Sequence, residues 1–299
     1  MYDRLVPGPP TRSPRAESRE ITELRAIKTR HPELAGAVDM HIELLGLQRR
    51  IQGRVPLPPL DFDANVFQRH QLEGRPVLRF EQIPLDLTDL RLMVRQTADV
   101  LHRFDALDAQ EFQLVHTLGR GDQLLEVAGR WYRRAAMRVA ASGAGVAPAL
   151  PLDSEPEIPE IVGHVLALAM RPFLSRCAEV LQRRTELATW THPHCALCGG
   201  EPDLATLDAH GDRQLVCGRC LLQWRFDAVT CPFCLNADRG RITSFGTSDG
   251  LYRVYGCDAC HRYLKAFDAR RATRPLMPVL DGVAMLPLDA AAMQRGYSS

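Results

Sequence analysis

Four C-x-x-C pairs in the last third of the 299-residue chain constrain its fold more than any other feature. Two residues between the cysteines allow one tight turn to direct both sulfur atoms at the same metal ion, and two such turns complete a tetrahedral site. The pairs are Cys195/Cys198, Cys217/Cys220, Cys231/Cys234 and Cys257/Cys260. We therefore predict two metal sites, each held by four cysteines.

The spacing of the pairs predicts which cysteines share an ion. Eighteen residues separate the first pair from the second and 22 the third from the fourth, whereas only ten separate the second from the third. Each longer interval contains two strand-like runs and a turn, which is enough for a hairpin with a cysteine pair near each end. Site one is predicted at Cys195, Cys198, Cys217 and Cys220, and site two at Cys231, Cys234, Cys257 and Cys260. An interleaved pairing stays open, because spacing does not fix connectivity.

Redox catalysis and simple burial are the alternatives to metal binding. A catalytic C-x-x-C begins a helix in a βαβ unit, and none of the four pairs has that setting. The ninth cysteine, Cys177, lies on the apolar stripe of a predicted helix and is predicted to be a core residue. His192, His194 and His261 flank the pairs, and we expect them outside the ligand sets because four thiolates already complete each site. Four sulfurs suit zinc and iron almost equally, so the ligands leave the metal open.

Apolar residues recur with helical spacing up to about residue 190 and indicate a helical bundle. The predicted helices cover 31–54, 86–104, 108–118, 123–140 and 160–189. Proline and glycine over 142–159 predict a linker, and Pro172 predicts a kink in the last helix. Beyond about residue 191, short runs typical of strands replace this pattern. These runs cover 204–207, 214–216, 221–226, 241–245, 251–255 and 262–267.

The predicted fold class is therefore α+β and multidomain. An N-terminal α-helical domain precedes two tandem small β modules of the rubredoxin-like or zinc-ribbon-like kind. The predicted boundaries are a flexible tail at 1–20, the helical domain at 21–190, the two modules at 191–229 and 230–271, and a C-terminal tail at 272–299 that packs back.

Charge argues against a nucleic-acid or membrane partner. The chain has 37 basic and 36 acidic residues, so no global positive field attracts phosphate. Residues 195–271 contain ten basic and nine acidic residues, and eight thiolates with two divalent ions bring the charge of this region to −3. A zinc-ribbon nucleic-acid-binding protein is therefore a disfavoured alternative.

Targeting and catalytic motifs are absent as well. The first 20 residues lack the apolar core of a signal peptide, and the best apolar stretch, 161–174, is interrupted by His164, Arg171 and Pro172. We expect a cytoplasmic protein, in which cysteines are metal ligands more often than disulfides. The phosphate-binding, zinc-protease and hydrolase motifs are missing, and four cysteines leave a metal no open position for catalysis. The sequence predicts a protein that is not an enzyme.

The cysteine motifs, in this order, resemble the formate dehydrogenase accessory protein FdhE family. The likeness rests on HCALCGGEP (194–202), CGRCLLQW (217–224), CPFC (231–234), GCDACHRYLK (256–265) and LDGVAMLPLD (280–289). In the helical region it rests on length, helical character and RPFL at 171–174. Asp258 and His261 stand where the family pattern leads us to expect glycine, and both lie at site two.

The resemblance implies a cytoplasmic, non-catalytic maturation factor with two rubredoxin-like modules. Each module would hold one iron as Fe(Cys)4, with zinc as the alternative. The implied partner is the catalytic subunit of a respiratory formate dehydrogenase before its export, and a homodimer stays open. The candidate contact residues are Trp224, Tyr263, Leu264 and Lys265, which lie inside the motifs, and Arg225, which directly follows one. A rubredoxin-like electron-transfer protein is the alternative function.

Overall fold

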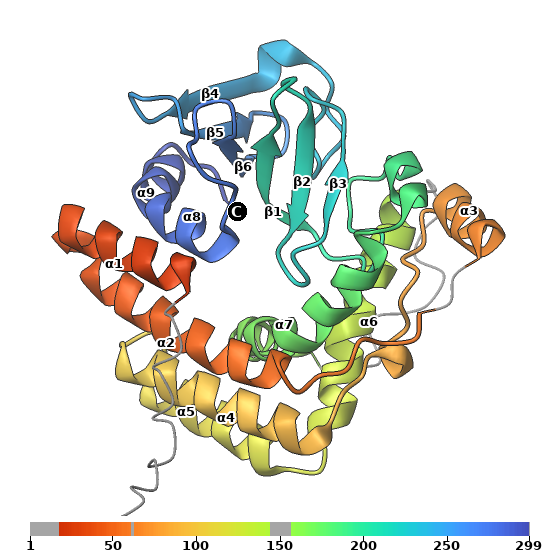
Figure 1. Ribbon diagram of the computed structural model, residues 1–299, viewed down its shortest axis with the longest axis vertical. Helices are drawn as coiled ribbons and strands as arrows, with labels where there is room; N and C mark the ends of the chain where they lie inside the picture. The colour runs from red at the N-terminus through yellow and green to blue at the C-terminus, as the bar shows by residue number, and fades with distance from the viewer. Residues whose placement is uncertain (1–17, 61–62, 144–156, 299) are drawn as a thin grey trace, which may run out of the picture.

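The computed structural model describes residues 18–60, 63–143 and 157–298. A helical region comes first, followed by a six-stranded sheet and two C-terminal helices (Figure 1). This is the α+β class that the sequence predicts. The predicted tail at 1–20 and the predicted linker at 142–159 lie largely outside the described residues.

The helical region is built from amphipathic helices, and side-chain caps fix the starts of several of them. Its helices are α1 Arg19–Arg30, α2 Ala35–Gln52, α3 Ala64–Glu73, α4 Leu87–Arg103, α5 Ala109–Arg120, α6 Leu124–Gly143 and α7 Glu160–Leu181. Asp63, Asp86 and Asp108 precede α3, α4 and α5, and each carboxylate accepts a hydrogen bond of 2.7 to 2.9 Å from the N–H three residues later. Such caps satisfy backbone donors that the helix cannot.

Helix α7 forms the centre of this region. Val165, Ala169 and Phe173 on α7 are buried against neighbouring helices, including α2, α4 and α6. Among the described helices, α7 is the one that is long and apolar enough to cross a membrane, but 56% of that stretch is buried inside the protein. This burial is typical of a core helix. The chain leaves α7 at Leu181 and forms a short 3₁₀ helix at Thr185–Thr189, where the sequence predicts continued α-helix.

The two cysteine-rich modules share a single sheet. Its strands are β1 Pro202–Leu207, β2 Arg213–Cys217, β3 Gln223–Arg225, β4 Ile242–Gly246, β5 Tyr252–Cys257 and β6 Arg262–Asp268. The strand order is β3-β2-β1-β6-β5-β4. Strands β1 and β6 are parallel, with Leu204 opposite Lys265 and Leu207 opposite Asp268, whereas the other neighbours are antiparallel. The tandem modules are therefore joined edge to edge.

The chain after residue 271 packs back through two helices, α8 Pro278–Ala284 and α9 Leu286–Gln294. In Figure 1, α8 and α9 lie between the sheet and α1. Leu280 and Val283 of α8 share an apolar cluster with Leu24 and Val38 of α1 and α2. Helix α9 contacts β5. The C-terminal helices thus connect the sheet to the helical region.

The largest apolar core continues from the helical region into the first cysteine module. Trp190, which is completely buried, lies at this junction and meets the ring of Phe67 edge-on at 6.2 Å between centroids. The Trp190 indole N–H donates a 2.8 Å hydrogen bond to the carbonyl of His194, immediately before the first cysteine turn. The helices therefore position site one directly.

Candidate metal centres

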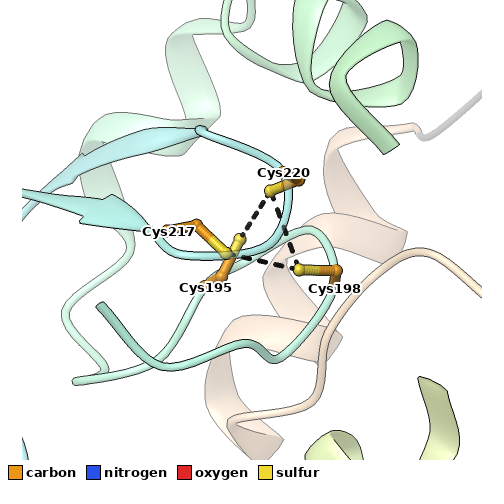
Figure 2. Close-up of side chains that lie close together, drawn as sticks. All are labelled: Cys195, Cys198, Cys217 and Cys220. Atoms are coloured by element: carbon orange, nitrogen blue, oxygen red, sulfur yellow. Dashed lines mark hydrogen bonds between the residues drawn. The ribbon is translucent and has the colours of Figure 1, made fainter. Parts of the chain in front are cut away.

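The cysteines predicted for site one converge from two turns (Figure 2). The Sγ atoms of Cys195 and Cys220 are 3.5 Å apart, those of Cys198 and Cys217 also 3.5 Å, and those of Cys198 and Cys220 3.7 Å. A tetrahedral ion with metal–sulfur bonds near 2.3 Å separates its sulfurs by about 3.8 Å, whereas a disulfide requires about 2.05 Å. The four free thiols therefore fit around one ion.

The cysteines predicted for site two form a second group of the same kind. Cys231 Sγ lies 3.8 Å from Cys260 Sγ, and Cys234 Sγ lies 3.7 Å from Cys257 Sγ. All four sulfurs are within 4.8 Å of one another. The structure thus brings the cysteines together in the predicted grouping rather than the interleaved one. Both groups could bind a metal ion, and four sulfurs fit zinc and iron alike.

All four C-x-x-C turns share one backbone conformation. The residue after the second cysteine has a positive φ: 69° at Gly199, 64° at Leu221, 61° at Leu235 and 55° at His261. The N–H of this residue donates to the carbonyl of the first cysteine at 2.8 to 3.1 Å. A left-handed conformation costs a non-glycine residue about 1–2 kcal/mol. Three turns keep it despite that cost, so His261 in place of glycine preserves the geometry of site two.

The thiols of site one differ in acidity. Burial raises the pKa of Cys195 and of Cys220 well above the ordinary value. Burial acts on Cys217 too, but hydrogen bonds from the other thiols and from the backbone outweigh it and hold the pKa of Cys217 well below that value. A metal bound by four thiolates must displace the remaining protons.

The helical region holds the first turn of site one through the backbone. The N–H groups of Val77 and Leu78 donate to the carbonyls of Ala196 and Leu197 at 2.9 and 3.0 Å. The hydroxyl of Tyr132 on α6 donates to the carbonyl of Leu78 at 2.9 Å. The segment that pairs with the turn is therefore itself fixed to a core helix.

The second turn of site one is held by two arginines. Arg171 of α7 donates a 3.0 Å hydrogen bond to the carbonyl of Gly218. Arg219 lies over the indole ring of Trp131 on α6, with its guanidinium carbon 4.0 Å from the ring centroid. Because all four sulfurs of site one are buried, this site is closed to solvent.

Site two is open on one side. Cys231 and Cys257 are buried, whereas Cys260 is half-buried and Cys234 is exposed. Leu235, next to Cys234, leaves 51% of its surface exposed. The two groups therefore have the same donor chemistry but very different access to solvent.

The C-terminal residues brace the last turn of site two. Asp258, inside that turn, accepts hydrogen bonds from the hydroxyl groups of Tyr297 and Thr243. The N–H of Ser298 donates to the carbonyl of His261 at 2.8 Å, and the N–H of Tyr263 donates to the carbonyl of Ser298 at 2.9 Å. Asp258, which stands where glycine is expected, therefore anchors the end of the chain to the turn. No sequence motif signals this contact.

Comparison with known proteins identifies relatives of the chain. No family model matches it. A curated protein of Aquifex aeolicus named FdhE homolog is 28% identical over 133 residues, which are 43% of this chain and 46% of that protein, so the match spans about half of the relative. The crystal structure of the FdhE protein from Pseudomonas aeruginosa has the same fold, with a TM-score of 0.56 at 19% identity over 94% of this chain and 91% of the other. The chain is thus similar to FdhE proteins, in sequence over part of its length and in fold over nearly all of it. The resemblance predicted from the cysteine motifs is confirmed.

The two histidines before the first cysteine, His192 and His194, contact backbone rather than sulfur. His192 Nε2 lies 2.6 Å from the carbonyl of Gln71, and His194 Nε2 lies 2.9 Å from that of Gly74. Both rings tie the first turn to the end of α3. Burial lowers the pKa of His194 to about 4, so its ring is neutral at physiological pH.

Four of the five predicted contact residues are wrong as surface contacts, because their side chains point into the protein. Trp224, Tyr263 and Leu264 are between 2% and 5% exposed. The side chain of Lys265 is 12% exposed and lies 3.3 Å from a carboxylate oxygen of Asp289. Strand residues of such small modules are needed for the core. Arg225 is exposed, as expected, and pairs with Asp212.

Proposed function

We propose that the protein is an accessory factor for the assembly of formate dehydrogenase, that it binds the catalytic subunit of that enzyme in the cytoplasm, and that it is not itself an enzyme. The similarity to FdhE proteins, in sequence and in fold, carries the proposal. The site chemistry supports it, since each group supplies four sulfurs to one ion and leaves no position where a substrate or water would bind.

Each group, in this proposal, holds one iron as Fe(Cys)4, and zinc is the alternative. A bound ion cross-links two turns and contributes folding free energy of roughly 10 kcal/mol or more per site. Contacts within the protein hold the turns in place around each ion. The helices fix the turns of site one, and the C-terminal residues brace the last turn of site two. Metal analysis with a visible spectrum separates the two metals, because ferric sites absorb in the visible range and zinc sites do not.

Deleting the gene in the native host tests the accessory role. Formate dehydrogenase activity should fall at least tenfold while the catalytic subunit is still synthesised. The wild-type gene should restore activity, whereas the double variant Cys198→Ala/Cys220→Ala should not. A tagged wild-type protein should also retain the catalytic subunit during purification. Full activity in the deletion strain would refute the proposal.

Electron transfer is a second candidate function, favoured by the exposure of Cys234 at site two. A redox centre exchanges electrons with a partner most readily when it lies near the surface. An iron-loaded protein that cycles reversibly between ferric and ferrous states in a redox titration would support this function. Zinc in both sites of the protein from its native host would exclude it.

A further inference from the structure

A cavity of about 220 Å³ lies beside site two. The face of the sheet forms one wall through Ile242 and Ser244 of β4 and Tyr255 of β5. Residues 228–233, from the segment that joins the two modules, also line the cavity. Cys231 and Cys257 also line the cavity, so whatever enters it touches the surroundings of the second metal.

The cavity opens on the side of the sheet that the C-terminal helices leave uncovered. Side chains alternate between the two faces along a strand. Phe245 of β4 lies beneath the guanidinium of Arg295, just after α9, at 3.8 Å, and Thr243 bonds to Asp258. Ile242 and Ser244, which alternate with these residues, therefore face the cavity.

Strand β4 is an edge strand, because the sheet order places it last and β5 is its neighbour on the inner side. The N–H of Thr247 donates to the carbonyl of Tyr252, and the N–H of Asp258 donates to the carbonyl of Arg241. Hydrogen-bonded positions alternate along an antiparallel pair, so the odd-numbered residues of β4 are the ones that bond to β5. The backbone groups of Ser244 and Gly246 consequently point to the free edge.

The charge around the cavity favours an acidic ligand at its rim. Arg213, Arg239 and Arg262 line the cavity, and no carboxylate does so among the described residues. Arg213 is only 5% exposed and donates to the carbonyls of Asp227 and Thr230, and Arg262 pairs with Glu201. Arg239 is exposed in the short 3₁₀ turn, Arg239–Arg241, that leads into β4. Arg239 is thus the cation placed to meet a partner.

We propose that the edge of β4 and this cavity form the docking site for an extended segment of the catalytic subunit of formate dehydrogenase, which is called the client below. The segment adds a strand to β4 through the backbone of Ser244 and Gly246, which is a recurrent way of binding peptides. It places an apolar side chain in the cavity, against Phe233 and Tyr255, and a nearby acidic residue against Arg239. The inference rests on the proposed function, and it means that the bound client covers site two.

Binding of the purified catalytic subunit of the host's formate dehydrogenase to the full-length, metal-loaded protein tests the docking site. Ser244→Pro removes the N–H that faces the free edge but keeps the bonds between β4 and β5, since proline is tolerated on edge strands. Ser244→Ala is the matched control, because it keeps the N–H. We expect Ser244→Pro to weaken binding at least tenfold and Ser244→Ala to leave it unchanged.

A charge reversal tests the same site without changing the backbone. Arg239→Glu should weaken binding about tenfold, whereas Arg69→Glu, at an exposed position on α3, should have no effect. In the wild-type complex, the amides of Ser244 and Gly246 should exchange with deuterium at least tenfold more slowly than in the free protein. Metal content, measured for each variant, confirms that both sites are intact.

The results separate the two proposals. If the wild type binds the catalytic subunit, and Arg239→Glu and Ser244→Pro bind equally well with no slowing of exchange in β4, the docking site is refuted and the proposed function stands. If the wild type does not bind the catalytic subunit, the proposed function is refuted and the docking site with it.

Discussion

The guanidinium group of Arg219 lies over the indole ring of Trp131, with 4.0 Å between the guanidinium carbon and the ring centroid. Arg219 lies between two cysteines of site one, whereas Trp131 belongs to the core of the helical region. Arg219 also contacts the carbonyls of Trp131 and Tyr132 at 3.5 and 3.4 Å. The side chain of Arg219 therefore couples the cysteines of site one to the helical region.

Replacing Arg219 with alanine should destabilise the metal-loaded protein by about 1–2 kcal/mol, because it removes a partly buried cation–π contact. Thermal unfolding should show the loss as a melting temperature several degrees lower. Arg69→Ala, which removes an exposed arginine from α3, is the control and should leave the temperature unchanged. Equal melting of Arg219→Ala and the wild type would contradict the coupling.

A chelator should remove the metal from site two before the metal from site one. Cys234 and Cys260 give access to site two, whereas every sulfur of site one is buried. Alkylation followed by mass spectrometry should label Cys234 first and Cys198 only after the protein unfolds. Simultaneous labelling of both sites would show that burial does not protect site one.

The double variant Cys198→Ala/Cys220→Ala should halve the metal content and unfold the first module.

His261→Val should destabilise the protein by about 1–2 kcal/mol and weaken metal binding at site two. A β-branched residue tolerates the φ of 55° at this position poorly. His261→Gly is the matched control: it relieves strain but adds freedom to the unfolded chain, so the net change should be within about 1 kcal/mol. Chemical denaturation and competition with a metal indicator measure the two effects. Equal stability of both variants would mean that the turn has rearranged.

Gly256→Ala should detach the C-terminal residues from site two. A Cβ at Gly256 would lie 2.6 Å from the Tyr297 ring, so the ring must move. The expected cost is about 1–3 kcal/mol, and limited proteolysis should then cleave the C-terminal segment faster. Gly282→Ala is the control, since its Cβ meets nothing within 4 Å and helix propensity favours alanine by up to about 1 kcal/mol. Unchanged proteolysis of Gly256→Ala would contradict the bracing role of Tyr297.

Cys177 should resist alkylation in the folded protein at pH 8. Burial in α7 raises the pKa of this thiol to about 12, and the thiolate is the reactive form. The folded state keeps a proton that the unfolded state loses above about pH 9, so stability should fall as the pH rises from about 9 to about 12. Cys177→Ala should lessen that fall. Rapid labelling of native Cys177 would show that α7 opens.

The sequence predicts the structure best where residues of one kind, such as cysteines or apolar residues, recur at a fixed spacing. The C-x-x-C pairs predict both cysteine groups, since a tight turn and a hairpin leave few ways to bring four sulfurs together. Helical periodicity locates α2 and α4 to α7, because their buried stripes are long. The strands follow from short alternating runs between turn residues. In each case the information is local.

Other features depend on contacts between distant residues, which no single-sequence pattern records. Helices α1 and α3 are short and polar, and their burial comes from α8 and from the Trp190 region. The pairing of β1 with β6 joins residues 61 positions apart, as Leu204 and Lys265 show. Four of the five predicted contact residues are wrong, because a small module needs its large strand side chains for its own core. The bracing of Asp258 by Tyr297 likewise requires the folded C-terminus.

The parallel pairing of β1 with β6 also has a consequence during translation. The ribosome delivers β1 about sixty residues before β6, so the nascent first module waits with an uncovered strand that is prone to self-association. In the proposed function, completion of the second module depends on the ion that its four cysteines hold. Cells short of metal should therefore accumulate this protein as insoluble aggregates rather than as a soluble apo form.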